Sequence, residues 1–266
     1  MPDATHFSPI KLLSTDFDGT LINHQTSPSV VPEFFSALAE LRARGVLWAV
    51  NTGRVRWHIE EGLKELTTPI EPDFLLTSER EVFHRGPDGD WVDFGDWNAR
   101  CLATHDTLFA QSSQLLSDIE SYLAKHTLSH PIYEGGRLIG LVADSEAEME
   151  QLCLFLTEEI SRVPGFHFMR NTVYVRFCHE DYNKGTALAE LGRLLHLQPE
   201  NIFAAGDHYN DIPMLDGQHA KWVTCPSNSV EAVKNQVLQA GGFIAKTPCS
   251  EGVVEALRHF KALPPA

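Results

Sequence analysis

Two aspartates separated by one residue follow a short apolar run near the start of the chain, in the stretch LLSTDFDGTL of residues 12–21. Placing the carboxylates of Asp16 and Asp18 at the end of a buried strand costs free energy, because they repel each other and lose water. Either the pair accepts hydrogen bonds in a turn, where Asp and Gly are common, or it binds something positively charged.

Three further polar clusters lie where strands are expected to end or helices to begin. In an open parallel sheet, ligands bind beyond the carboxyl ends of the strands. Taken singly, each cluster also has a structural explanation, such as helix capping by acidic residues or a solvated lysine. The clusters are Thr52 with Gly53, Lys184, and Asp207 with Asn210 and Asp211.

The residue types in these clusters favour one kind of chemistry. Several carboxylates crowded together cannot all stay ionised without a compensating cation. An all-oxygen ligand set suits Mg²⁺, which takes a few carboxylates and keeps several waters. Lysine, a threonine hydroxyl and a glycine amide are groups that bind phosphate. The combination predicts phosphoryl transfer.

The elements that position these clusters alternate between strands and helices. Apolar runs at 10–15, 46–50 and 74–77 predict buried strands, and a helix is expected from Pro32 until Gly45. The same alternation returns after Lys184 and continues to the last helical segment. We therefore predict an α/β fold, with a doubly wound parallel sheet as its core.

The middle third of the chain has a different pattern. Asp88-Gly89 indicates a hairpin, a long helical region follows at about 97–125, and further short strands flank a helix at 147–160. We predict an inserted α+β cap domain over residues 84–181. The catalytic core is then discontinuous and comprises residues 1–83 and 182–266.

Composition excludes several classes of protein. Among 266 residues, 36 are acidic and 21 basic, and this net charge of −15 argues against a surface for nucleic acid or anionic membranes. No apolar run reaches the ~20 residues that span a bilayer. The N-terminal stretch lacks the features of a signal peptide, and the five cysteines are scattered, so we expect a cytoplasmic protein.

Four segments carry a resemblance to a known family. DFDGT, NTGR, NKGTAL and GDHYND, in this order, resemble the four motifs of the haloacid-dehalogenase superfamily. The chain is similar in particular to its Cof-type sugar-phosphate phosphatases, whose large cap is inserted between the second and third motifs. The C-terminal stretch GFIAKTPCSEGVVEAL is also similar to that subgroup.

The resemblance implies roles for the acidic residues. Asp16 matches the nucleophile that becomes an aspartyl-phosphate, and Asp18 matches the general acid and base. The implied cofactor is Mg²⁺, which in the family contacts the first aspartate, the backbone carbonyl of the second, and the residue matched by Asp207. Asp211 matches the acid that supports the metal-bound waters.

The resemblance also implies a phosphate-binding set. Thr52, the amide of Gly53 and Lys184 match the phosphate clamp, and Asn210 matches a position near the phosphate. Lys184 would also keep Asp16 ionised. One segment departs from the family, because Ser78-Glu79-Arg80 stands where Cof-type sequences commonly have Asn-Gly.

Together these features predict a Mg²⁺-dependent phosphatase for a small phosphomonoester, most plausibly a sugar phosphate. Two alternatives remain: a sugar phosphomutase on the same scaffold, or a non-catalytic phosphosugar-binding regulator, which the presence of both Asp16 and Asp18 disfavours. The substrate and the oligomeric state stay open. Arg54 could contact the substrate or form a surface salt bridge, and His126 and His130 are expected to flank a helix end rather than to bind a metal.

Overall fold

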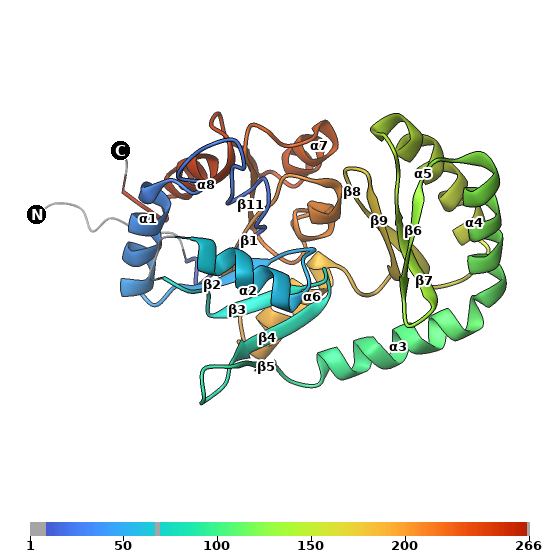
Figure 1. Cartoon of the computed structure of the whole chain (residues 1–266). Helices are drawn as coiled ribbons and strands as arrows, with labels where there is room; N and C mark the ends of the chain where they lie inside the picture. The colour runs from blue at the N-terminus through green and yellow to red at the C-terminus, as the bar shows by residue number, and fades with distance from the viewer. Residues whose placement is uncertain (1–8, 67–69, 265–266) are drawn as a thin grey trace, which may run out of the picture. The chain divides into compact units, whose positions relative to one another are not determined.

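The computed structural model describes residues 9–66 and 70–264 of the chain (Figure 1). Its contacts divide the chain into two compact units. The first, called the sheet unit here, comprises residues 1–98 and 184–266, and the second, the inserted unit, comprises residues 99–183. The inserted unit is thus one continuous stretch between two halves of the sheet unit.

A single large sheet organises the sheet unit. In the described residues it has eight strands, and β1 lies inside it between β10 and β2. Their spatial order is β12 (Phe243–Ile244), β11 (Trp222–Cys225), β10 (Ile202–Ala205), β1 (Leu12–Thr15), β2 (Leu47–Asn51), β3 (Phe74–Thr77), β4 (Glu81–Arg85) and β5 (Trp91–Asp93).

The direction of the strands confirms a doubly wound fold. From β1 the chain proceeds to β2 and β3 on one side, and later to β10, β11 and β12 on the other, with every one of these pairings parallel. Only the β4–β5 hairpin adds antiparallel pairings. The order of the sheet reverses between β1 and β10, which is the place where ligands bind in such folds.

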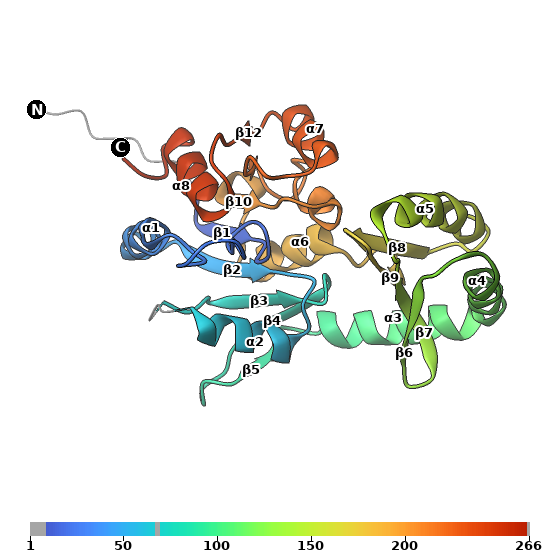
Figure 2. The ribbon, with the colours of Figure 1, turned by 45° about the horizontal axis from the view of Figure 1, so that its top comes forward.

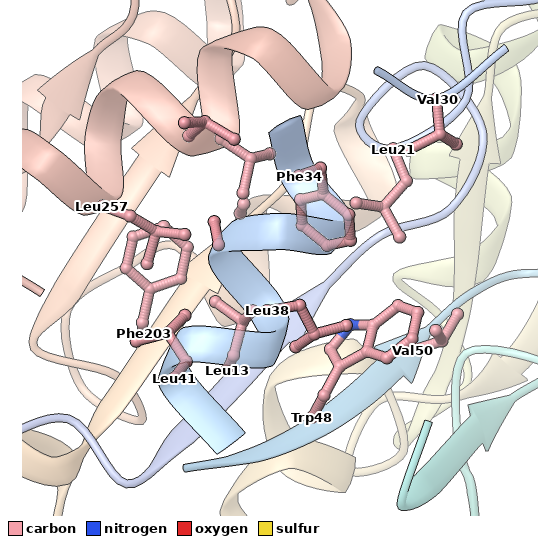
Figure 3. Close-up of a cluster of buried hydrophobic side chains, with 14 of the residues drawn as sticks. Leu13, Leu21, Val30, Phe34, Leu38, Leu41, Trp48, Val50, Phe203 and Leu257 are labelled. Carbon is pink, nitrogen blue, oxygen red and sulfur yellow. The ribbon is translucent and has the colours of Figure 1, made fainter. Parts of the chain in front are cut away.

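One face of the sheet is covered by α1 (Pro32–Ala43), α2 (Arg56–Glu65) and α8 (Cys249–His259). Pro32 occupies the first turn of α1, and its buried residues Phe34, Leu38 and Leu41 recur at helical spacing. Figure 3 shows these side chains packed with Trp48 of β2 and with neighbouring residues of β1, β10 and α8. This cluster holds the central strands in place under the helices.

The opposite face is covered by α6 (Lys184–Leu194) and α7 (Glu231–Gln239), which both contact the short 3-10 helix η2 (Tyr209–Met214) (Figure 2). Phe203 belongs to the first cluster, whereas Gly192 of α6 lies against the side chain of Ile202, the preceding residue of β10. Since successive side chains of a strand point to opposite faces, α6 lies on the second face. Another short 3-10 helix, η1 (Pro199–Asn201), leads into β10.

The inserted unit has its own antiparallel sheet and core. Side chains of α4 and α5 pack with those of the sheet in one buried cluster, and the Ser145 side chain caps α5 by accepting from the Glu148 amide at 3.2 Å. Its helices are α3 (Trp97–Gln111), whose first two residues belong to the sheet unit, α4 (Ser113–His126) and α5 (Glu146–Ile160). Its strands in spatial order are β6 (His130–Glu134), β7 (Arg137–Val142), β9 (Tyr174–His179) and β8 (Phe166–Asn171).

The boundary of the insert differs from the expected one. The inserted unit runs over 99–183 rather than 84–181, because the β4–β5 hairpin pairs with β3 and belongs to the large sheet. Its side chains Phe83 and Trp91 are buried in the cluster under α1 and α2. Burial of these two aromatic residues explains why the hairpin joins the sheet unit.

Two further expectations need correction. The helical region at 97–125 is two helices, separated at the buried Ser112, whose hydroxyl donates to the carbonyl of Leu108 at 2.7 Å. Strand β6 was not expected. The five cysteines are free, and no helix in the described part of the chain is long and apolar enough to cross a membrane.

Candidate active site

Asp16 and Asp207 lie at the point where the strand order reverses. Asp16 directly follows β1, and Asp207 follows β10 by two residues. The Asp16 amide donates to the carbonyl of Ala205 at 2.9 Å, which extends the parallel ladder between these strands by one bond. The backbone of Asp16 is therefore fixed by the sheet, and its side chain starts beside the end of β10.

Lys184 forms ion pairs with both Asp16 and Asp211. Its ammonium donates to Asp16 Oδ1 at 2.7 Å and to Asp211 Oδ1 at 2.6 Å, and the lysine is fully buried. Lys184 is the first residue of α6, and its carbonyl accepts from the side-chain amide of Asn51 at 3.0 Å. The start of α6 is thus tied to the end of β2, which places the ammonium between two carboxylates.

Asp211 also organises the backbone after β10. Its Oδ2 accepts from the amides of Asp207 at 2.8 Å and His208 at 2.9 Å, so it caps η2 while Oδ1 binds Lys184. The capping role that acidic residues often have at a helix start is therefore present. Asp211 thus caps the helix and also belongs to the group of three carboxylates with Asp16 and Asp207.

Asp207 is held by residues of the loop after β1. The Thr20 hydroxyl donates to Asp207 Oδ1 at 2.7 Å. Gly19 has a φ of 80°, and a Cβ at this position would lie 2.4 Å from Asp207 Oδ2. Only glycine fits here, because the loop must pass close to the carboxylate in a left-handed conformation.

The three carboxylates form a site suited to a hard cation. Asp16, Asp207 and Asp211 each offer an oxygen within 4.8 Å of the others, and one ammonium cannot compensate three negative charges. Burial and the Asp211 charge raise the pKa of Asp16 well above its ordinary value, and they raise the pKa of Asp207 to about 7. A divalent cation bound by oxygen ligands would relieve this excess charge.

The ammonium of Lys184 stays charged in this surrounding. Burial alone would lower the pKa of Lys184, but the charges and hydrogen bonds of Asp16 and Asp211 outweigh burial and raise its pKa. A permanently charged group beside Asp16 can bind the oxygens of a phosphate as well as the carboxylate. Lys184 therefore keeps a positive charge beside Asp16 and Asp211.

Asp18 lies beside the cluster with partners of its own. Arg54 makes a two-pronged ion pair with it, at 2.7 Å from Nε to Oδ2 and 2.6 Å from Nη2 to Oδ1. His24 Nε2 lies 2.8 Å from Oδ1 of the same carboxylate. Burial alone would raise the pKa of Asp18, but the hydrogen bonds and charges of Arg54 and His24 lower it below its ordinary value. Arg54 is thus a partner of Asp18, and the sequence did not identify His24.

A third group of residues gathers around the end of β2. The Thr52 hydroxyl accepts from the Arg54 amide at 3.1 Å, and the Thr52 carbonyl accepts from the Glu79 amide at 3.1 Å. Asn210 Nδ2 donates to Glu79 Oε1 at 2.9 Å, and this oxygen would lie 3.2 Å from a Cβ placed on Gly53. The buried carboxylate of Glu79 thus joins Gly53 and Asn210, a neighbourhood that no motif indicated.

His126 and His130 flank the end of a helix, as expected. His126 is the last residue of α4, and His130 is the first residue of β6. Among the described residues, the group able to hold a metal through three carboxylates contains neither of them. The interpretation of HTLSHP as a helix end is confirmed.

Comparison with known proteins agrees with this geometry. A family model described as haloacid dehalogenase-like hydrolase matches residues 120–257, slightly more than half of the 266 residues. The 5-amino-6-(5-phospho-D-ribitylamino)uracil phosphatase of Bacillus subtilis is 25% identical over 264 residues, covering 94% of this chain and 96% of the relative. The mannosylfructose-phosphate phosphatase of Agrobacterium fabrum is 24% identical over 262 residues, covering 95% and 97%.

Among solved structures, the sucrose-phosphatase of Synechocystis, in complex with sucrose and phosphate, has the same fold. The TM-score is 0.65 at 22% identity, and the alignment covers 94% of this chain and 97% of that one. The fold, the order of the four motifs and the family match agree. The chain therefore belongs to the haloacid dehalogenase-like hydrolases.

Proposed function

We propose that this hydrolase is a Mg²⁺-dependent phosphatase that cleaves a small phosphomonoester, in particular a sugar phosphate, through a phosphorylated Asp16. The observation that carries the proposal is the buried Lys184 ammonium between Asp16 and Asp211, with Asp207 beside them. Carboxylates for a hard cation and a cation for phosphate lie together where the strand order reverses. This combination serves phosphoryl transfer better than any other reaction.

In the first half-reaction, a carboxylate oxygen of Asp16 attacks phosphorus, and the bond from phosphorus to the ester oxygen breaks. Asp18 gives its proton to that leaving oxygen. In the second half-reaction, Asp18 accepts a proton from a water that attacks phosphorus, and the bond from Asp16 to phosphorus breaks. Arg54 and His24 lower the pKa of Asp18, so its carboxylate is ionised in the free protein and must take up a proton from solvent before the first step. Arg54 stabilises the ionised form between the two steps.

Asp16, Asp207 and the backbone carbonyl of Asp18 would hold the magnesium ion, and Asp211 would support its waters. When bound, the ion neutralises charge on the transferring phosphoryl group. Lys184, the Thr52 hydroxyl and the Gly53 amide would orient the phosphoryl oxygens. Asp211 is already committed to two backbone amides and to Lys184, which suits a supporting role rather than direct ligation.

The choice of a sugar phosphate rests on the relatives. Two of the similar proteins act, by their names, on the phosphates of mannosylfructose and of a ribityl compound, and a third is a sucrose-phosphatase. Binding energy from the sugar can help to position the reacting groups at Asp16.

Stoichiometric release of inorganic phosphate is the expected result when the purified protein meets a panel of sugar phosphates with Mg²⁺. Hydrolysis should stop when the metal is chelated and return when Mg²⁺ is added back, because the acidic cluster then has its cation again. Zn²⁺ should substitute poorly in an all-oxygen site. Isomerised sugar phosphate as the main product would instead indicate a mutase, and full activity after exhaustive chelation would refute the metal site.

Mg²⁺ should stabilise the protein more at about pH 8 than at about pH 6. The pKa of Asp207 is raised from 3.8 to about 7, so between these values the folded metal-free protein binds more protons than the unfolded chain and loses stability as pH rises. At low pH the metal must displace this proton, whereas at high pH it meets an ionised ligand.

The measurement is the shift in Tm on adding excess MgCl₂ at the two pH values. The variant Asp207→Asn is the control, since it has no proton to displace at this position and loses a ligand. It should show a smaller shift that depends less on pH than that of the unmodified protein. An equal Mg²⁺ shift at both pH values in the unmodified protein would contradict the assignment of Asp207 as a ligand.

A further inference from the structure

The turn after β3 holds two residues in an uncommon backbone conformation. Ser78 and Glu79 have φ values of 52° and 67°, in the left-handed region that favours glycine. A non-glycine residue is disfavoured there because its Cβ crowds the backbone. This turn is also where the chain departs from the Asn-Gly of the proteins it resembles. Glu79 thus occupies a backbone conformation that glycine would adopt more readily.

The surroundings of the turn keep Glu79 inside the site. The Ser78 amide donates to the Arg54 carbonyl at 2.9 Å, and the Glu79 amide donates to the Thr52 carbonyl at 3.1 Å. Both acceptors belong to the segment NTGR, which carries the proposed phosphate clamp. Glu79 is only 4% exposed, so its carboxylate is directed into the sheet unit rather than toward solvent.

The carboxylate has one protein partner. Its Oε1 accepts from Asn210 Nδ2 at 2.9 Å, and its other oxygen accepts no hydrogen bond from the described residues. A Cβ on Gly53 would lie 3.2 Å from Oε1 and 3.7 Å from Asn210 Nδ2. Glu79, Asn210 and the Gly53 backbone therefore meet at one place, beside the group proposed to bind phosphate.

This contact decides how the Asn210 side chain is oriented. An ionised carboxylate can only accept hydrogen bonds, so the amide must turn its NH₂ group and not its oxygen toward Glu79. The amide nitrogen carries two hydrogens, and one remains after the bond to Glu79. The oxygen Oδ1 of Asn210 is buried and has no hydrogen-bond partner among the described residues, which is a cost of this orientation.

We propose that Glu79 is a positioning residue, which holds the Asn210 amide so that its second N–H donates to the phosphoryl group of the substrate. The inference rests on the proposed phosphatase function and adds a residue outside its four motifs. Without Glu79, the amide could rotate and satisfy its buried oxygen in another way. The oxygen of the Asn210 amide, an acceptor, would then face the phosphate in place of the N–H donor.

The test measures binding of inorganic phosphate by calorimetry, in the presence of Mg²⁺, for single and double variants of the full chain. Glu79→Gly should weaken phosphate binding by about tenfold, the loss expected for one hydrogen bond to a charged group. Asn210→Ala should weaken it by about as much. In the double variant, Glu79→Gly should add less than about a twofold loss, because residues that act as a unit are not additive. If Asn210→Ala does not fold, Asn210→Ser takes its place.

Two further variants distinguish a positioning role of Glu79 from a purely structural one. Glu79→Gln keeps an acceptor for Asn210 and should retain phosphate affinity within about threefold. Glu81→Gln is the matched control at the start of β4, two residues after Glu79, because its carboxylate accepts from Thr77 at 2.8 Å instead of from a site residue. It should leave affinity unchanged. Glu79→Gly should keep or raise Tm, since glycine relieves the left-handed backbone.

Several outcomes would overturn the inference: phosphate binding that tightens in Glu79→Gly, additive losses in the double variant, or an unmodified protein that does not bind phosphate. If the phosphatase proposal itself is wrong, the experiments would give a different result. In that case the unmodified protein would bind phosphate and respond to Glu79→Gly, yet would release no phosphate from any ester.

Discussion

Asp16→Asn should lower turnover of a phosphomonoester by more than about a thousandfold while the protein stays folded. The carboxamide cannot attack phosphorus, so no phosphorylated intermediate forms. The backbone of residue 16 should not move, because its amide bonds to Ala205 within the sheet. The substitution also removes one of three crowded carboxylates, and Asn can still accept from Lys184.

The Asp16→Asn substitution should also change the Tm, and the direction of this change can be predicted. Burial and the neighbouring carboxylates raise the pKa of Asp16, so its ionised form destabilises the metal-free protein as pH rises. The metal-free Asp16→Asn variant should therefore have a Tm equal to or above that of the unmodified protein at about pH 8. Asp88→Asn, in the exposed hairpin turn, is the control for both readouts. Turnover near the unmodified rate in Asp16→Asn would refute the covalent route.

The positions of the site residues could be predicted because each follows a strand or opens a helix. The run 10–15 ends at Asp16, the run 202–205 ends just before Asp207, and α6 begins at Lys184 itself. Parallel strands bring their carboxyl ends to one edge of the sheet, so residues far apart in sequence meet there. The doubly wound fold could be inferred from the same alternation of strands and helices.

The partners of these residues could not be inferred in this way. Thr20 and Asp207 are separated by 187 positions, and Glu79 and Asn210 by 131, so no local pattern relates them. His24 reaches Asp18 from a loop whose course depends on tertiary contacts. The predicted boundary divides the β4–β5 hairpin after Phe83, because hairpin signals do not state which sheet they join. Burial of Phe83 and Trp91 decides that question, and it is visible only in three dimensions.

Lys184→Met should cost both activity and stability. Turnover should fall by about a hundredfold or more, because the substitution removes the buried positive charge that faces the phosphoryl group. The free energy of unfolding should fall by about 3–5 kcal/mol at about pH 8, since breaking a buried ion pair leaves its partners uncompensated. Here the partners are Asp16 Oδ1 and Asp211 Oδ1, at 2.7 and 2.6 Å from the ammonium.

The pH dependence of that loss distinguishes a charge effect from a packing effect. The pKa of Asp16 is already raised, and without Lys184 Asp16 keeps its proton in the folded protein to a still higher pH than in the unfolded chain, so stability should fall as pH rises. The deficit of Lys184→Met should therefore be smaller at about pH 5, and added Mg²⁺ should restore part of the Tm at about pH 8. Lys64→Met, on the exposed surface of α2, is the matched control and should show neither effect. A deficit that is the same at every pH and insensitive to Mg²⁺ would mean that Lys184 serves packing alone, and the assignment of its ammonium to the charge balance of the site would be wrong.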